Sequence, residues 1–369
     1  MALRTKTAVG NRRVNQNSTQ GLSNLKPGQR ATLFPSLGYF DVRRGCWRSF
    51  VHGRVFTDGQ TQLGTRILLS GLKKAMKVTP EQVASETFQQ RIDGFLAAPG
   101  RRRRIVLEIA QRHYRLRRRT RRNGAFYGTL TLPEKAFPRH ADALQGRSLT
   151  TTMRLLQSTD EVGTIEGTSG QLHVVSPHGL SVISDIDDTI KMTQATSRSE
   201  MLANTFLRPF EVVEGMAPLY RHWQQFGCDF HYVSSSPWQL YAPLAELCLT
   251  SDFPVGSMHL RYFRVRDEMF KRFRPIRRNT KVGIIIGILK RLPFRKFILV
   301  GDSGEKDPEI YRFLAHRFPD RVCAVLIRNL HSHPLSDKRL RKLRTIEGQT
   351  QLRIFEHSEE IYDAAQCVV

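Results

Sequence analysis

The chain has 369 residues, of which 40% are apolar and 9% aromatic, and its 58 Lys and Arg against 33 Asp and Glu give a formal net charge of +25. This is the length and composition of a folded protein with about two domains. The longest apolar stretch, VGIIIGIL at 282–289, is far shorter than the roughly 20 residues of a membrane-spanning helix. The five cysteines form no CxxC pair, which excludes the common zinc spacings and favours reduced thiols in the cytoplasm.

The positive charge is concentrated in the front half of the chain. Residues 1–180 contain 30 of the Lys and Arg but only 11 of the acidic residues. We therefore expect the front half to contact a polyanion, such as anionic lipid or nucleic acid. Residues 1–35 are polar and rich in Gly, Asn and Pro, without the apolar core of a signal peptide, and are predicted to form a disordered basic arm.

Residues 36–177 have the alternating pattern of a β-rich domain. Strands are predicted at 45–56, over 105–132 as a meander with an Asn123–Gly124 hairpin turn, and near 151–156 and 171–176. Between the first two lies a helical insertion at about 66–98, where Thr79, Pro80 and Gln82 form a helix start. We expect a β-sandwich-like domain with this helical insert.

Eleven arginines lie between residues 101 and 122 of this domain. One interpretation is an ordinary solvated sheet face. The alternative is a docking surface for a negatively charged membrane, because so many like charges on about two strands repel one another unless an anion neutralises them.

From residue 178 onward, short apolar runs alternate with helical segments, which is typical of a parallel sheet covered by helices. Strands are expected at 179–184, 228–234, 296–302 and 321–328. Active sites in such sheets lie at the carboxyl ends of the strands. We predict a Rossmann-like α/β catalytic domain over 178–369.

Acidic residues follow two of these strands. Asp185 and Asp187 come after the first, in SDIDDTIK, and Asp302 and Asp307 come after another, in VGDSGEKDPE. Carboxylates crowded at one edge of a sheet need a cation, and oxygen ligands of this kind suit Mg²⁺. Glu305 is either a further ligand or a loop cap.

A phosphate site is predicted next to these carboxylates. Ser234, Ser235 and Ser236 end a strand, and their hydroxyl and amide groups can bind an anion, although the last two could instead cap the following helix. Lys281 opens a helix and can direct its ammonium to the same place.

The order of these motifs resembles that of the haloacid dehalogenase superfamily of phosphatases. SDIDDTIK, SSSPWQLY and FILVGDSGEKDPEIY resemble more closely the actin-patch-associated phosphatidate phosphatase family, which converts phosphatidate to diacylglycerol with Mg²⁺. The likeness covers about 178–330.

The resemblance implies a role for each residue. Asp185 is the nucleophile that forms an aspartyl-phosphate, and Asp187 is the general acid and base. The expected Mg²⁺ ligands are the Asp185 side chain, the Asp187 carbonyl, Asp302 and Asp307, the last directly or through water. The catalytic set is completed by two phosphate-binding residues, Ser234 and Lys281, with Ser235 as a third phosphate contact.

We therefore expect a Mg²⁺-dependent phosphatidate phosphatase in the cytoplasm, in peripheral contact with the inner face of an anionic membrane. Two alternatives remain. The chain could be a phosphatase that acts on nucleic acid ends or another soluble phosphomonoester, because Arg-rich surfaces also bind phosphate backbones. It could also be a catalytically silent scaffold, which the complete set of site residues argues against.

Overall fold

A computed structural model describes residues 21–57, 70, 79–133, 137, 148–158, 165–193, 203–261 and 281–366 of the chain. The elements of its front part are β1 (Gln29–Leu33), β2 (Ser36–Asp41), β3 (Cys46–Thr57), α2 (Pro80–Ala84), α3 (Glu86–Leu96), β4 (Ala98–Pro99), β5 (Val106–Ile109), β6 (Arg112–Arg115), β7 (Ala125–Thr131), β8 (Leu149–Ser158) and β9 (Ile165–Val174). No helix among the described residues is long and apolar enough to cross a membrane.

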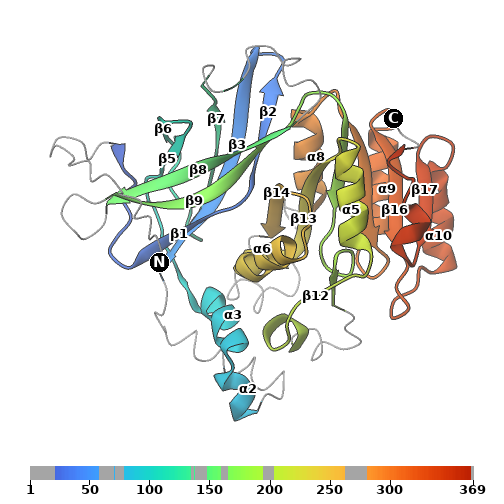
Figure 1. Cartoon of the computed structure of the whole chain (residues 1–369), viewed down its shortest axis with the longest axis horizontal. Helices are drawn as coiled ribbons and strands as arrows, with labels where there is room; N and C mark the ends of the chain where they lie inside the picture. Colours follow the sequence, from blue (N-terminus) through green and yellow to red (C-terminus); the bar gives the residue numbers. More distant parts are fainter. Residues whose placement is uncertain are drawn as a thin grey trace, which may run out of the picture.

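The front part is built on a nine-stranded sheet in the order β1-β3-β2-β9-β8-β5-β6, with β4 and β7 paired to β3 (Figure 1). The long strand β3 organises this sheet, because β7 pairs along one of its edges while β2 and β1 share the other. The strands are joined in one hydrogen-bonded sheet, so the predicted sandwich of two sheets is not confirmed. The β-rich character of this part is confirmed.

Two predictions for the front part are corrected. The basic arm predicted over residues 1–35 extends too far, because β1 pairs with β3 and the Ser23 hydroxyl is held by the backbone of Val106; residues 1–20 lie outside the described residues. The predicted meander is also wrong in its third strand. β5 and β6 form a hairpin, but β7 pairs with β3. Between β6 and β7 the Thr120 hydroxyl donates to the Gly100 carbonyl.

The helical insert has the predicted start. Thr79 and Gln82 form a reciprocal capping box, and Pro80 occupies the first turn of α2. The apolar face of α3 packs through Phe88 and Ile92 against Phe206 of the back part. Most of the insert before residue 79 lies outside the described residues.

The back part has a six-stranded parallel sheet in the order β14-β13-β10-β15-β16-β17. Its elements are β10 (Leu180–Ser184), β11 (Lys191–Met192), β12 (Glu211–Val212), α5 (Met216–Gln225), β13 (Asp229–Pro237), η3 (Trp238–Leu240), α6 (Tyr241–Thr250), β14 (Gly256–Arg261), α8 (Lys281–Arg291), β15 (Lys296–Asp302), α9 (Asp307–Arg317), β16 (Val322–Arg328), α10 (Asp337–Leu343), η4 (Arg344–Ile346), β17 (Gln351–Phe355) and η5 (Ser358–Ile361). The predicted parallel α/β sheet is confirmed.

Helices cover both faces of this sheet. Successive residues of a strand point to opposite faces, so Val182 packs on the side of α5 and α6, whereas Ile183 packs on the side of α8, α9 and α10. The strands are therefore apolar on both faces, as the sequence pattern predicted.

The front part packs directly on the edge strand β14. The Met258 amide donates to the Pro35 carbonyl at 3.0 Å, and His52 Nε2 lies 3.0 Å from the Met258 carbonyl. Phe34 enters the core on one face of the parallel sheet, and Leu37 enters the core on the other. The contact covers an edge that would otherwise expose unpaired backbone groups.

Candidate active site

The acidic residues of the two motifs meet because their strands are neighbours. β10 lies between β13 and β15, and the Asp185 amide donates to the Val300 carbonyl at 2.9 Å. Asp185 therefore follows directly on the end of β10, next to Asp302 at the end of β15. Asp307 opens α9, the helix that follows β15.

Asp185, Asp302 and Asp307 form an acidic cluster in which one carboxylate oxygen of each residue lies within 4.8 Å of the others. All three residues are 0% exposed. One Asp302 oxygen accepts hydrogen bonds from the Gly304 and Glu305 amides. The Oδ2 atoms of all three have no hydrogen-bond partner among the described residues. Buried carboxylate oxygens without partners are costly unless a cation binds them, so the acidic cluster fits a hard divalent ion.

Lys281 lies at the start of α8 and brings one positive charge to the acidic cluster. Its Nζ is 2.8 Å from Asp185 Oδ1 and also pairs with Asp307 Oδ1. Burial acts to lower the pKa of Lys281, but the charges of Asp185 and Asp307 outweigh burial and raise it. One lysine does not balance three carboxylates.

The excess negative charge raises the pKa values of two aspartates in the acidic cluster. Burial raises the pKa of Asp185 well above its ordinary value, and the carboxylates of Asp307, Glu305 and Asp302 raise it further against the opposing charge of Lys281. Burial and Asp307 raise the pKa of Asp302 to about 7. A bound cation would reverse these shifts, because it favours the ionised carboxylates.

Asp187 lies outside the acidic cluster and has different partners. Its Oδ2 accepts hydrogen bonds from Ser234 at 3.1 Å and Ser236 at 2.6 Å, and its Oδ1 pairs with Lys191 Nζ at 2.7 Å. Burial alone would raise the pKa of Asp187, but Lys191 and the two serine hydroxyls lower it. The pKa values of the two aspartates of the DxD motif are thus shifted in opposite directions, upward for Asp185 and downward for Asp187.

The three serines do not cap a helix. β13 continues through Pro237, and no side-chain cap precedes η3, so the helix-cap alternative for Ser235 and Ser236 is wrong. The Ser235 hydroxyl donates to Glu305 Oε2 at 3.1 Å instead. The extended strand directs the hydroxyls to the ends of β10 and β15.

The sequence did not indicate roles for Lys191 or Thr193, and it did not indicate the hydrogen bond from Ser236 to Asp187. Lys191 is 2% exposed and donates to the Thr193 hydroxyl. It is the last residue of SDIDDTIK, four positions after Asp187, and that spacing was the available signal. Asp188 has φ 53° and accepts a hydrogen bond from the Thr193 amide, so its side chain holds the turn.

The structure has a parallel sheet with helices on both faces, and carboxylates from two strand ends lie around a buried lysine, as the α/β pattern and the motifs predicted. Residues 180–329 match the family model for the catalytic domain of phosphatidate phosphatase APP1.

Two curated proteins are similar to this chain. Phosphatidate phosphatase APP1 of Saccharomyces cerevisiae is 39% identical over 158 residues, covering 42% of this chain and 26% of that protein. An uncharacterized protein of Schizosaccharomyces pombe is 32% identical over 183 residues, covering 48% of this chain and 30% of that protein. The chain thus spans less than a third of the length of these relatives.

A solved structure of a HAD-like phosphatase candidate from Mesorhizobium loti is also similar. It is 15% identical and covers 47% of this chain and 89% of that one, with a TM-score of 0.30. That score is too low to support a statement about fold.

Proposed function

We propose that this protein is a Mg²⁺-dependent phosphatidate phosphatase that acts through an aspartyl-phosphate on Asp185. The observation that carries the proposal is the acidic cluster with its buried, unpaired oxygens next to Lys281. The match of residues 180–329 to the catalytic domain of a phosphatidate phosphatase supports the substrate.

Mg²⁺ would be held by Asp185, Asp302 and Asp307 together with the Asp187 carbonyl. When bound, it supplies positive charge that favours ionised carboxylates and attracts the phosphoryl oxygens. The unpaired Oδ2 atoms of the acidic cluster support this ligand set.

Asp185 would attack phosphorus, because Lys281 pairs with its Oδ1 and fixes the orientation of the carboxylate. The bond from phosphorus to the alcohol oxygen breaks as the bond to Asp185 forms, and water then hydrolyses the aspartyl-phosphate. Lys281, Ser234 and Ser235 would donate to the phosphoryl oxygens. Lys281 already faces two carboxylates, so a phosphoryl oxygen would be the third anionic group around its ammonium.

Asp187 would protonate the departing alcohol and later remove a proton from the attacking water. In the structure its low pKa, set by Lys191 and the serine hydroxyls against the effect of burial, keeps it ionised. The arriving phosphate dianion opposes that ionisation, since like charges raise the pKa of a carboxyl group. Substrate binding would thus prepare Asp187 for its role as an acid.

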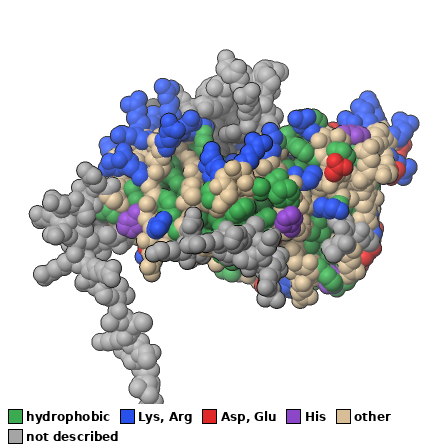
Figure 2. Space-filling view, turned by 90° about the horizontal axis from the view of Figure 1, so that it is seen from above, with side chains coloured by type: hydrophobic (Ala, Val, Ile, Leu, Met, Phe, Trp, Pro, Cys, Tyr) green, Lys and Arg blue, Asp and Glu red, His purple; other side chains and the backbone are tan. Residues whose placement is uncertain are grey.

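The arginines at 101–122 support peripheral contact with an anionic membrane. Nine of the eleven are exposed, and Glu108 is the one acidic residue in that stretch. Figure 2 shows Lys and Arg side chains over the end of the molecule that the β-rich part forms, and others at the opposite end. Basic residues close to an anionic surface contribute about 1 kcal/mol each.

Phosphate release with Mg²⁺ tests the proposal. We expect turnover of phosphatidate in mixed micelles and little turnover of a 5′-phosphorylated oligonucleotide, and the reverse preference would favour the nucleic acid alternative. Asp185→Asn should abolish release, whereas the control Asp188→Asn, which keeps the oxygen that accepts from Thr193, should retain it. Turnover by Asp185→Asn would refute the nucleophile.

A second measurement tests the membrane contact. Binding to vesicles should increase with the content of anionic lipid and weaken as salt rises, because a charged surface is screened. Replacement of Arg117, Arg118 and Arg119 by Gln should weaken binding without a loss of turnover on a monomeric substrate. Binding that ignores lipid charge and salt would refute the contact.

A further inference from the structure

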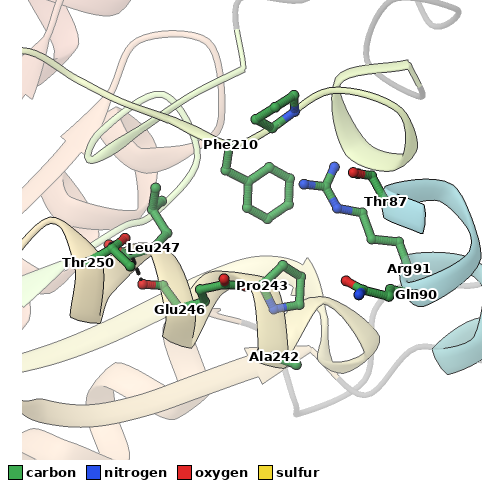
Figure 3. A pocket seen from close by; sticks show the side chains of 10 residues that line it. Thr87, Gln90, Arg91, Phe210, Ala242, Pro243, Glu246, Leu247 and Thr250 are labelled. Atoms are coloured by element: carbon green, nitrogen blue, oxygen red, sulfur yellow. Dashed lines mark hydrogen bonds between the residues drawn. The ribbon is translucent and has the colours of Figure 1, made fainter. Parts of the chain in front are cut away.

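A cavity of about 380 Å³ lies next to the candidate active site, between α3, α6 and the residues before β12 (Figure 3). Its lining combines the apolar side chains of Phe210, Pro243 and Leu247 with the charged side chains of Arg91 and Glu246. That volume falls within the range of small-molecule sites, which are mostly apolar with a few polar groups.

Phe210 connects the cavity to the catalytic residues. Arg91 Cζ lies 4.0 Å from the centre of its ring, and Lys191 Nζ lies 4.7 Å from the same centre. Lys191 in turn pairs with Asp187 at 2.7 Å. Two direct contacts therefore separate the cavity wall from the carboxylate that would protonate the leaving group.

The wall on the side of α3 is held in a defined position. Arg91 is 7% exposed, and its Nη1 donates to the carbonyls of Thr205 at 2.8 Å and Arg208 at 2.6 Å. These bonds join the helical insert of the front part to the segment that leads to Phe210. The cavity is thus a built feature, to which the front part contributes one side.

The charges of the lining indicate which part of a substrate fits. Arg91 and Glu246 are of opposite sign, and Glu246 acts to raise the pKa of Arg91 against the stronger, opposite effect of burial. The cavity therefore offers no net positive charge to a phosphate dianion. Apolar walls with a few hydrogen-bonding groups suit a neutral ester instead.

We propose that this cavity binds the alcohol part of the substrate, the acyl-bearing glycerol that leaves as diacylglycerol. The inference rests on the proposed function. Asp187 must contact the leaving oxygen to protonate it, and Lys191 and Phe210 join Asp187 to the cavity wall. The carbon skeleton would then extend from Asp187 toward the cavity. The helical insert of the front part then contributes to selection of the leaving group.

Two monomeric substrates test this inference, namely glycerol 3-phosphate and dioctanoyl phosphatidate, which differ in the acyl groups. Ala242→Trp and Thr87→Trp each place a large ring in the cavity from opposite walls. The matched control is Leu249→Trp, on the same helix as Ala242 but 81% exposed.

The ratio of kcat/KM for the dioctanoyl substrate over glycerol 3-phosphate is the quantity to compare. We expect it to be well above one in the unaltered protein, to fall about tenfold in both cavity variants through a higher KM, and to stay unchanged in the control. A variant that fails to fold would lose activity on both substrates, which leaves the other variant to decide.

An unchanged ratio in a folded cavity variant, or no preference in the unaltered protein, would overturn the inference while leaving the proposed phosphatase intact. Absence of Asp185-dependent release from either substrate is a different result. It would overturn the proposed function and this inference together.

Discussion

Replacement of Asp302 by Asn should stabilise the metal-free protein, although it removes one of the proposed Mg²⁺ ligands. Burial and the neighbouring Asp307 raise the pKa of Asp302 from 3.8 to about 7. A carboxyl group with a folded-state pKa above its unfolded value binds its proton more tightly when folded, so stability is lost as pH rises from about 4 to about 7. At about 1.4 kcal/mol per pKa unit, the ionised group costs the protein about 4 kcal/mol at pH 8.

Asparagine removes the charge and retains the local hydrogen bonds. Asp302 Oδ1 accepts from the Gly304 amide at 2.7 Å and the Glu305 amide at 3.0 Å, and the amide oxygen of Asn can do the same. At the position of Oδ2, which has no hydrogen-bond partner among the described residues, Asn has an amide NH2 group that can donate to the neighbouring carboxylates.

Urea unfolding in EDTA between pH 5 and pH 8 measures the effect. The variant should exceed the unaltered protein in free energy of unfolding by a margin that grows with pH toward about 4 kcal/mol. Mg²⁺ at 1,000 times its Kd should cancel this difference, since it contributes about 4.1 kcal/mol to the protein that binds it.

Asp252→Asn is the control, because the Asp252 side chain is 78% exposed and does not belong to the acidic cluster. It should change stability little under either condition. An Asp302→Asn protein that is less stable than the unaltered protein in EDTA at pH 8, or that gains as much from Mg²⁺, would refute the assignment of the acidic cluster to a cation site.

Three further predictions concern neighbouring features. Gly301→Ala should reduce turnover at least tenfold and weaken Mg²⁺-dependent stabilisation, since an added Cβ would lie 2.1 Å from Asp307 Oδ2; wild-type kinetics would contradict the close approach. Lys191→Met should move the acidic limb of the kcat/KM profile to higher pH, because it removes the charge that lowers the pKa of Asp187; an unmoved limb in an active variant argues against this role. Burial lowers the pKa of His52 to about 4. The free energy of unfolding therefore falls as pH drops below 6.5, and His52 accounts for a loss of about 2 kcal/mol at pH 5. In urea titrations the stability of His52→Gln should depend less on acid pH than that of the unaltered protein.

The motifs predicted the candidate site well where chemistry depends on strand ends. Asp185 and Asp302 each follow an apolar run, and parallel neighbouring strands place such residues at one edge of the sheet. Lys281 opens α8 as expected. The roles of these residues in catalysis stay predictions, which the variants above test.

Contacts between segments distant in the chain were beyond the sequence. The partner of β7 is β3 and not the preceding strand. The sequence could not predict this, because local alternation shows that a strand exists but not which edge it joins. The cavity wall at Arg91 likewise depends on α3 meeting residues 204–208, more than 100 positions later.

The sequence by itself determined the local elements and the chemical groups at their ends: the capping box of α2, the strands apolar on both faces, and the acidic motifs. These follow from interactions within a few residues and from side-chain periodicity. Only the tertiary structure decided that the β-rich part covers the edge strand β14 and that the helical insert lines the cavity. Packing between distant surfaces is set by shape and burial, which no local pattern encodes.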